Sequence, residues 1–339
     1  VGVFDGHGEQ GGRISNVARD VLSKSLFDHR DLHSDPKGAL ESAYREAQKQ
    51  IEKRHGPEAQ DSGTTAVSAY QHRDRLFVAN VGDSRAVLGR CDTSRGGTLS
   101  AVELSRDHKP SRADERQRII AAGGKVEQGI FPVSVGPGGT VRWMRGGPER
   151  VMSRNGLGGL AVSRSLGDLS LRPFVSAQPE VVERKLDPKD KFIVLGSDGI
   201  WDQVSSKEAV DIVGRHADPS TAAQEITGVA RKRWKMQTGG QLADDITAVV
   251  MKLDNSSPPL TLGSIQVGHS RDGSVGGRTQ KNQQGGSSSS SPLRPDYGGS
   301  GYLQNTLDSR RPKSHNVRRG SEPPGLAPRP VTTGQVRRR

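Results

Sequence analysis

Three aspartates stand where a predicted strand begins or ends, and together these residues could do chemistry. Asp5 and Asp198 each follow a short apolar run, and Asp244 precedes the apolar residues 246–253. Carboxylates brought together repel one another unless they share a proton or a cation, and oxygen ligands select hard ions such as Mg²⁺ or Mn²⁺. Two such ions can activate a shared water that attacks phosphorus, which would hydrolyse a phosphate ester. A single Asp-Gly pair is also an ordinary turn, so each pair alone is weak support.

The single cysteine, Cys91, limits the alternatives. It excludes an intramolecular disulfide, which favours a reducing compartment. A cysteine-based phosphatase would need an arginine at position 97 to hold phosphate, and this chain has Gly97 there. The sequence also contains no apolar run long enough to span a membrane and no signal-peptide pattern.

Positive charge gathers in the last part of the chain. The 339 residues carry a net charge of +12, and residues 255–339 hold 13 of the 50 Lys and Arg but only 4 of the 38 Asp and Glu. This segment is rich in Gly, Ser, Pro and Arg and has no periodic apolar spacing. We therefore expect one globular domain at 1–253 and a disordered basic tail at 254–339. The basic clusters of the tail could direct nuclear import, contact an acidic partner or simply be solvated.

Apolar spacing predicts the elements that position these aspartates. Strands are expected at 1–4, 64–70, 75–80, 85–89, 181–186, 191–196 and 246–253. Helices are expected at 14–26, after Asp35-Pro36, at 111–122, and after Ser205 and Asp218-Pro219, with Glu208 completing a capping box. Strands and helices are grouped rather than alternating, which predicts an α+β fold of two packed antiparallel β-sheets flanked by helix pairs, an αββα sandwich.

Six motifs, all in the same order, resemble those of the type 2C family of metal-dependent protein serine/threonine phosphatases. They are VFDGHG at 3–8, SGTTA at 62–66, NVGDSR at 80–85, LAVSRSLGD at 160–168, SDGIWD at 197–202 and DDIT at 244–247. The resemblance implies Mg²⁺ or Mn²⁺ ligands: Asp5 bridging two ions, the Gly6 carbonyl, Asp198 and Asp244, with Asp83, Asp202 and Asp198 holding a third, weaker ion. Asp83 could instead cap the turn at 82–84.

His7 is the remaining residue to which the resemblance gives a chemical role. Its family counterpart is thought to protonate the departing seryl or threonyl alkoxide, a strong base that needs a proton donor. His7 could instead only orient a ligand or a water. We interpret residues 62–65 and 160–168 as turns and packing, although the Gly-Asp pair at 167–168 could approach the site, and we interpret Trp201 as a core residue.

Two departures from the family pattern affect these expectations. Family members carry a phosphate-binding arginine and a metal-binding glutamate upstream of the Asp-Gly-His motif, and nothing precedes Val1 here. We therefore expect a fragment that lacks its N-terminal strands. Residues 128–154 read as a surface insertion or flap, in which Arg142, Arg145, Arg150 and Arg154 are candidate contacts to an acidic phosphopeptide or belong to a solvated loop.

The resemblance implies that metal-activated water hydrolyses phosphoserine and phosphothreonine in proteins, without a covalent phosphoenzyme. The alternative is a pseudophosphatase that acts as a regulatory binding module. A nucleic-acid partner would bind only nonspecifically through the tail, whose aromatic residues are Tyr297 and Tyr302. We expect a monomer with a cytoplasmic or nuclear location, or both.

Overall fold

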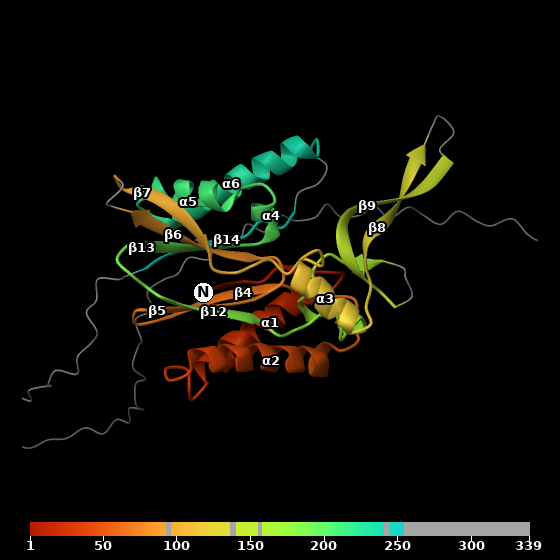
Figure 1. The fold of residues 1–339 in the computed structure, drawn as a ribbon, viewed down its shortest axis with the longest axis horizontal. Coiled ribbons are helices and arrows are strands. Elements are labelled where there is room, and N and C mark those ends of the chain that lie inside the picture. Colours follow the sequence, from red (N-terminus) through yellow and green to blue (C-terminus); the bar gives the residue numbers. More distant parts are fainter. Residues whose placement is uncertain (93–95, 136–139, 155–157, 241–243, 254–339) are drawn as a thin grey trace, which may run out of the picture. The chain divides into compact units, whose positions relative to one another are not determined.

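The structure is a computed structural model (Figure 1), and it describes residues 1–92, 96–135, 140–154, 158–240 and 244–253. The tail predicted at 254–339 lies outside these described residues. Within them, no helix is both long enough and apolar enough to cross a membrane.

Two four-stranded antiparallel sheets form the centre of the fold (Figure 1). In spatial order the first sheet contains β1 (Gly2–Val3), β4 (Ala66–His72), β5 (Arg75–Val81) and β12 (Glu180–Lys185). The second contains β14 (Ala248–Lys252), β13 (Asp190–Gly196), β6 (Arg85–Asp92) and β7 (Thr98–Glu103). The strands at the centre of each sheet are those that the sequence predicted, whereas β7 was not predicted.

Successive side chains of a strand point to opposite sides of a sheet. In both sheets apolar side chains are buried on each of these sides. Val67 of β4 is buried in one cluster with Leu88 of β6 and Ile193 of β13, so the two sheets pack face to face. Its neighbour Ala66 belongs to a different cluster, shared with helices on the outer side. Burying a side chain of this size stabilises the fold by about 1.5–3 kcal/mol. The predicted packing of two sheets is confirmed.

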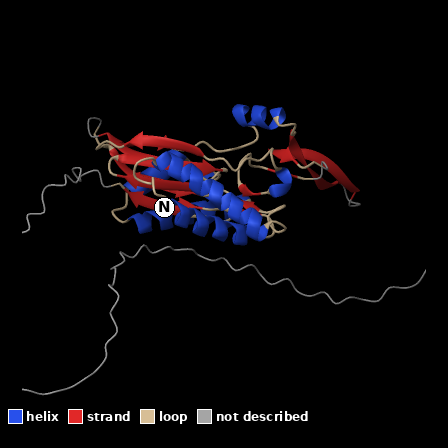
Figure 2. Ribbon diagram, turned by 90° about the horizontal axis from the view of Figure 1, so that it is seen from below, coloured by secondary structure: helices blue, strands red, loops and turns tan. Residues whose placement is uncertain are grey.

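Helix pairs cover the outer faces of both sheets (Figures 1 and 2). Helices α1 (Gly11–Phe27) and α2 (Pro36–His55) share a buried cluster with the first sheet. Helices α5 (Ser206–Gly214) and α6 (Pro219–Gln237) share another with the second sheet. The view from below shows two long helices lying across the strands (Figure 2). The αββα arrangement is therefore confirmed.

Polar side chains begin these helices as predicted. Asp35 accepts a hydrogen bond from the backbone N–H of Gly38 at 3.0 Å, and Asp218 accepts one from Thr221 at 2.8 Å. Ser205 accepts the N–H of Glu208 at 3.2 Å, which is the first half of the predicted capping box. The Glu208 carboxylate binds Arg233 of α6 and so ties the two outer helices together.

Two smaller sheets and three short helices complete the described part of the chain. One sheet joins β2 (Gly6–His7), β3 (Gly63–Thr64) and β11 (Leu166–Gly167), and the other joins β8 (Val126–Val135), β9 (Thr140–Met152) and β10 (Gly159–Leu160). The helices are α3 (Ala113–Ala121), α4 (Asp198–Trp201) and the 3₁₀ turn η2 (Leu169–Leu171). The segment predicted as an insertion or flap thus contains most of two long paired strands, β8 and β9.

Candidate active site

The smallest sheet, β2-β3-β11, brings His7 next to Asp168. Gly63 of β3 pairs with His7 on one side and with Gly167 on the other, so the residue after Gly167 lies close to the imidazole. The Nε2 atom of His7 is 2.8 Å from Oδ2 of Asp168. Asp168 is buried and His7 is about one quarter exposed, so the pair has one side that a substrate could reach.

Gly63 is required for this contact. A Cβ atom at position 63 would lie 2.1 Å from Oδ2 of Asp168 and 2.7 Å from the carbonyl oxygen of Leu166. Any side chain at this position would therefore push Asp168 away from His7. The segment 62–65, predicted as a turn, thus also leaves the room that the contact between His7 and Asp168 needs.

A short, strained turn holds Asp168 in place. Its backbone has a φ of +48°, a left-handed conformation that few residues other than glycine adopt. Its N–H donates to the carbonyl of Ser62 at 3.0 Å, and its Oδ2 also accepts the hydroxyl of Ser165. Because such strain persists only where the surroundings impose it, the turn is a structure that the rest of the fold maintains.

The buried guanidinium of Arg172 supports the same turn from behind. It donates to the carbonyls of Gly167 at 2.7 Å, Ser165 at 3.0 Å and Val175 at 2.6 Å. Burial lowers the pKa of Arg172 to about 10, which leaves the side chain charged at neutral pH. Arg172 therefore holds backbone carbonyls both before and after Asp168 in the sequence.

Opposing effects set the protonation of His7. Burial alone would lower its pKa, but the hydrogen bond and charge of Asp168, together with the charges of Asp83 and Asp198, raise the pKa above its ordinary value. This shift favours the imidazolium, which is the form that a proton donor needs.

The backbone of Asp5 is held at the end of β1 by two neighbouring threonines. The Asp5 carbonyl accepts the N–H of Thr65 at 2.9 Å and the hydroxyl of Thr64 at 3.0 Å. Burial, followed by the charges of Asp198 and Asp244, raises the pKa of Asp5 to about 9. The three predicted carboxylates are therefore close enough to oppose one another's ionisation.

A hydroxyl connects the segments that carry Asp198 and Asp244. Ser197, directly before Asp198, donates its hydroxyl to the carbonyl of Asp245 at 2.8 Å and accepts the N–H of Thr247 at 3.1 Å. Burial and the charges of Asp83 and Asp244 raise the pKa of Asp198 to about 7. The strand-end geometry thus brings the two carboxylate segments together as expected.

A lysine offsets part of this negative charge. The ammonium of Lys109 binds the buried carboxylate of Asp83 and also interacts with Asp198 and Asp202. Burial alone would lower the pKa of Lys109. The charges of the three carboxylates outweigh burial and raise the pKa above its ordinary value. Burial raises the pKa of Asp202, although the positive charge of Lys109 opposes this increase.

The donor atoms of the site suit a hard cation. The carboxylates of Asp5, Asp198 and Asp244 offer only oxygen, and burial, together with the charges of neighbouring aspartates, raises the pKa of each. Among the residues that the structure describes, no three or more His, Cys, Asp or Glu side chains are arranged around one point as metal ligands. The fit is thus one of donor chemistry and charge rather than of a completed ligand shell.

Comparison with known proteins identifies the family of this chain. The family model described as Protein phosphatase 2C matches residues 1–238. The chain belongs to the protein phosphatase 2C family. The resemblance that the six motifs indicated is therefore confirmed.

Curated relatives in the protein phosphatase 2C family agree with this assignment. "Probable protein phosphatase 2C 69" of Arabidopsis thaliana is 40% identical over 251 residues, which cover 74% of this chain and 60% of the relative. "Probable protein phosphatase 2C 71" of the same plant is 40% identical over 263 residues, covering 78% and 50%. The chain thus spans between half and two thirds of the length of these two relatives.

Solved structures share the protein phosphatase 2C fold. The serine-threonine phosphatase 2C of Toxoplasma gondii matches with a TM-score of 0.59 at 22% identity, covering 74% of this chain and 83% of that one. A sex-determining protein of C. elegans matches with a TM-score of 0.51 at 23% identity, covering 74% and 55%. At these identities the likeness concerns the fold alone.

Asp168 and Lys109 are site residues that sequence reasoning missed in this protein phosphatase 2C chain. We interpreted 160–168 chiefly as packing and turn geometry, and that interpretation was incomplete because Asp168 binds His7. Lys109 drew no attention, although it pairs with Asp83. The one available signal was the Gly-Asp pair at 167–168, which we noted as able to approach the site. Trp201 is buried as predicted and donates its indole N–H to Gly196 at 2.8 Å.

The arginines of the predicted flap divide into two groups. Arg150 and Arg154 bind backbone carbonyls at the root of the hairpin, at 2.9 Å and 3.2 Å. Arg145 pairs with Glu127 across the strands, and Arg142 is exposed. The contact of these arginines with an acidic phosphopeptide stays a prediction, for which Arg142 is exposed and Arg145 would have to leave Glu127.

Proposed function

We propose that this chain is the catalytic region of a metal-dependent protein serine/threonine phosphatase, a phosphoric monoester hydrolase. The observation that carries the proposal is the placement of the His7–Asp168 pair beside the mutually repelling carboxylates of Asp5 and Asp198. A proton donor and a cation-binding donor set in one place are the two things that hydrolysis of an alkyl phosphate requires.

The carboxylates of Asp5, Asp198 and Asp244 and the Gly6 carbonyl would hold Mg²⁺ or Mn²⁺. Two bound ions would lower the pKa of a water and offset the charge of the phosphate. Asp83 and Asp202 would add a third, weaker site, for which Lys109 now supplies positive charge. Position 6 has no room for a side chain, because a Cβ atom there would lie 2.3 Å from the carbonyl oxygen of Gly11.

His7 would protonate the leaving group. In the protonated ring Nε2–H would donate to Asp168, which would leave the proton on Nδ1 for transfer. As the oxygen of water bonds to phosphorus, the bond from phosphorus to the seryl or threonyl oxygen breaks, and the Nδ1 proton passes to that oxygen. Asp168 touches no reacting atom in this scheme. It is a positioning residue that keeps the ring protonated and correctly turned.

The reaction would need no covalent phosphoenzyme. Cys91 lies near the end of β6 in the second sheet and has Gly97 where a cysteine phosphatase would place its arginine. In the proposed reaction the attacking group is water, and the proposed substrates are phosphoserine and phosphothreonine in proteins.

The test is Mn²⁺-dependent dephosphorylation of a phosphoserine peptide by the full-length protein, compared with two aspartate variants. Asp198→Ala removes a proposed ligand, and Asp211→Ala removes an exposed aspartate that pairs with Lys207 on α5. We expect Asp198→Ala to lose at least about 10²-fold in kcat/KM and Asp211→Ala to match the parent.

Two results would overturn the proposal. One is a folded full-length protein that binds phosphopeptide but releases no phosphate with either metal, which would favour a regulatory binding module. The other is phosphate release that Asp198→Ala leaves unchanged.

A further inference from the structure

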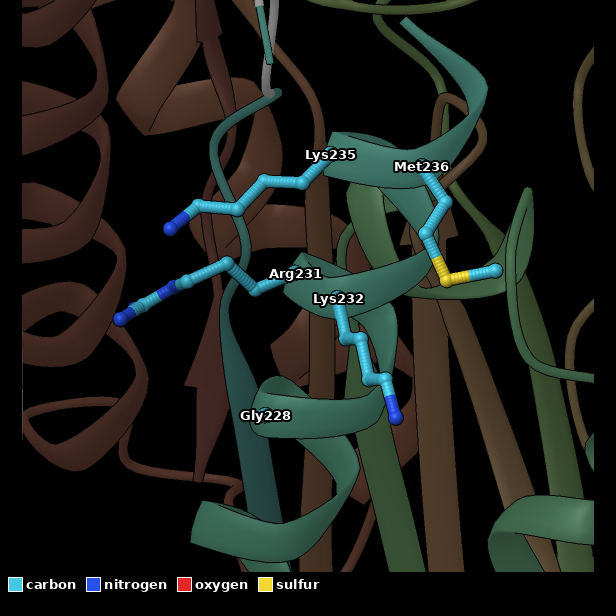
Figure 3. A pocket seen from close by; sticks show the side chains of 5 residues that line it. All are labelled: Gly228, Arg231, Lys232, Lys235 and Met236. Atoms are coloured by element: carbon cyan, nitrogen blue, oxygen red, sulfur yellow. The ribbon is translucent and has the colours of Figure 1, made fainter. Parts of the chain in front are cut away.

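We propose that the outer face of helix α6 is a docking site for an acidic segment of a partner protein. The surface consists of Gly228, Arg231, Lys232, Lys235 and Met236, which line a cavity of about 420 Å³ (Figure 3). We call it the α6 groove. It lies outside the proposed active site, and the inference does not depend on the proposed hydrolysis.

The opposite face of α6 is already used by the fold. Ala222, Ile226 and Ala230 are buried against the second sheet. The indole N–H of Trp234 donates to the carbonyl of Gly199 at 2.8 Å, which fixes the C-terminal half of the helix next to α4. The α6 groove is therefore a free face on a rigidly held helix.

Helical spacing gives the groove its shape. Arg231 and Lys235 are four residues apart and extend to one side, whereas Lys232 and Met236 extend to the other (Figure 3). One turn earlier, Gly228 has no side chain, and a Cβ atom placed there would meet no atom within 4 Å. The groove thus combines a ridge of two cations, a second ridge of one cation and one methionine, and a notch at Gly228.

The positive charge of the groove is unbalanced. Among the described residues, no carboxylate is within ion-pair distance of Arg231, Lys232 or Lys235. The single carboxylate of α6, Glu225, already binds Arg215 and His216. Cations near a helix C-terminus favour the helix dipole, but like charges four residues apart oppose each other. An incoming acidic side chain would relieve this repulsion.

Met236 indicates that the occupant also has an apolar side chain. It is 71% exposed, at the edge of the same cavity. A flexible thioether suits an adaptable contact with an apolar side chain seated over the Gly228 notch. Nucleic acid fits less well because the groove offers no aromatic ring for stacking, and a membrane would need a broader apolar face. The chain's own tail is excluded as occupant because it is itself strongly basic.

Binding of a fluorescein-labelled peptide rich in glutamate, with leucines at helical spacing, tests the docking site in the full chain. Arg231→Glu combined with Lys235→Glu should weaken binding by about ten-fold or more, and Met236→Ala by a smaller factor. The matched control is Lys49→Glu with Lys53→Glu, an exposed pair at the same spacing on α2. It should bind like the parent, and all variants should hydrolyse para-nitrophenyl phosphate equally.

Equal weakening by the α2 control would overturn the proposal, because it would show that only overall charge matters. Stronger binding to a DNA duplex or to phosphatidylserine vesicles than to the peptide would overturn it as well. Peptide binding that depends on α6, in a protein without phosphatase activity, would support the docking site and count against the proposed function alone.

Discussion

The Nε2 atom of His7 lies 2.8 Å from Oδ2 of Asp168, a residue 161 positions later in the chain. The contact exists because both residues flank Gly63 across the β2-β3-β11 sheet. The contact orients the imidazole beside the acidic cluster, and the proposed function gives that imidazole the role of proton donor.

Gly63→Ala should impair both stability and catalysis. The new methyl group would lie 2.1 Å from Oδ2 of Asp168, so the turn must shift and the His7 contact must lengthen. We expect a loss of about 1–3 kcal/mol in the free energy of unfolding and a lower kcat, measured by denaturant titration and peptide dephosphorylation.

Gly12→Ala on α1 is the matched control, because a Cβ atom there would meet nothing within 4 Å. It should leave kcat unchanged and stabilise the protein by about 0.4–1 kcal/mol. A Gly63→Ala protein with parental kcat would show that the spacing at position 63 does not hold the pair.

Divalent metal should stabilise the protein more as the pH rises. The folded state holds the pKa of Asp198 at about 7 and that of Asp5 at about 9, both above the ordinary value of 3.8. The metal-free folded state therefore binds more protons than the unfolded state, and its stability falls as the pH rises from about 4 through 7 towards 9. Mn²⁺ would replace those protons, adding about 2.7 kcal/mol at one hundred times its dissociation constant.

Thermal unfolding with and without Mn²⁺ between pH 6 and 8.5 measures this effect. The Asp198→Asn variant should be more stable than the parent without metal, since it removes a repelling charge, yet it should gain little from Mn²⁺. A metal-induced shift in Tm that is independent of pH, or that persists in Asp198→Asn, would contradict the ligand assignment.

A buried carboxylate at the start of α3 should make stability depend on acidic pH. Burial would raise the pKa of Glu115, but hydrogen bonds from Arg164, Arg118 and Ser163 lower it from 4.5 to about 2. Because the folded pKa is depressed, the stabilisation is complete above pH 4.5 and is lost as the pH falls towards 2. Glu115→Gln should cost about 3 kcal/mol at neutral pH and little near pH 2.

Glu183→Gln provides the contrast, because Glu183 on the edge strand β12 forms a solvent-exposed ion pair with Arg75 of β5. An exposed pair of this kind contributes about 0–1 kcal/mol. Urea unfolding at several pH values compares the two variants. Equal losses for both would mean that burial of Glu115 contributes nothing beyond a surface ion pair.

Much of the fold could be predicted because local signals agreed with the tertiary structure. Asp35 and Asp218 cap the helices that their sequence context indicated. Strand β7, Thr98–Glu103, was missed because its side chains are partly exposed and its apolar alternation is weak. Leu99 and Ala101 face one buried cluster and Val102 another, a pattern that is clear only once β6 is beside it.

The candidate site was predictable only where sequence motifs marked it. Asp5, Asp198 and Asp244 stand at strand ends, so their convergence followed from the expected sheets. The partner of His7 could not be derived in this way, because the contact depends on a two-residue strand and on the left-handed turn at Asp168. Lys109 lies in a loop whose position is set by contacts distant in sequence, including a hydrogen bond from His108 to Gly82.

The most direct test of the account is the dependence of the Asp168→Asn variant on the leaving group. Asp61→Asn, which removes a carboxylate bound to Ser170 at the neighbouring turn, is the control. With a phosphoserine peptide, kcat of Asp168→Asn should fall by about 10²-fold, because a seryl alkoxide needs the proton of His7. With para-nitrophenyl phosphate, whose leaving group is a weak base, the loss should be about threefold or less. Equal losses with both substrates, or no loss with the peptide, would contradict the role of the His7–Asp168 pair in proton transfer.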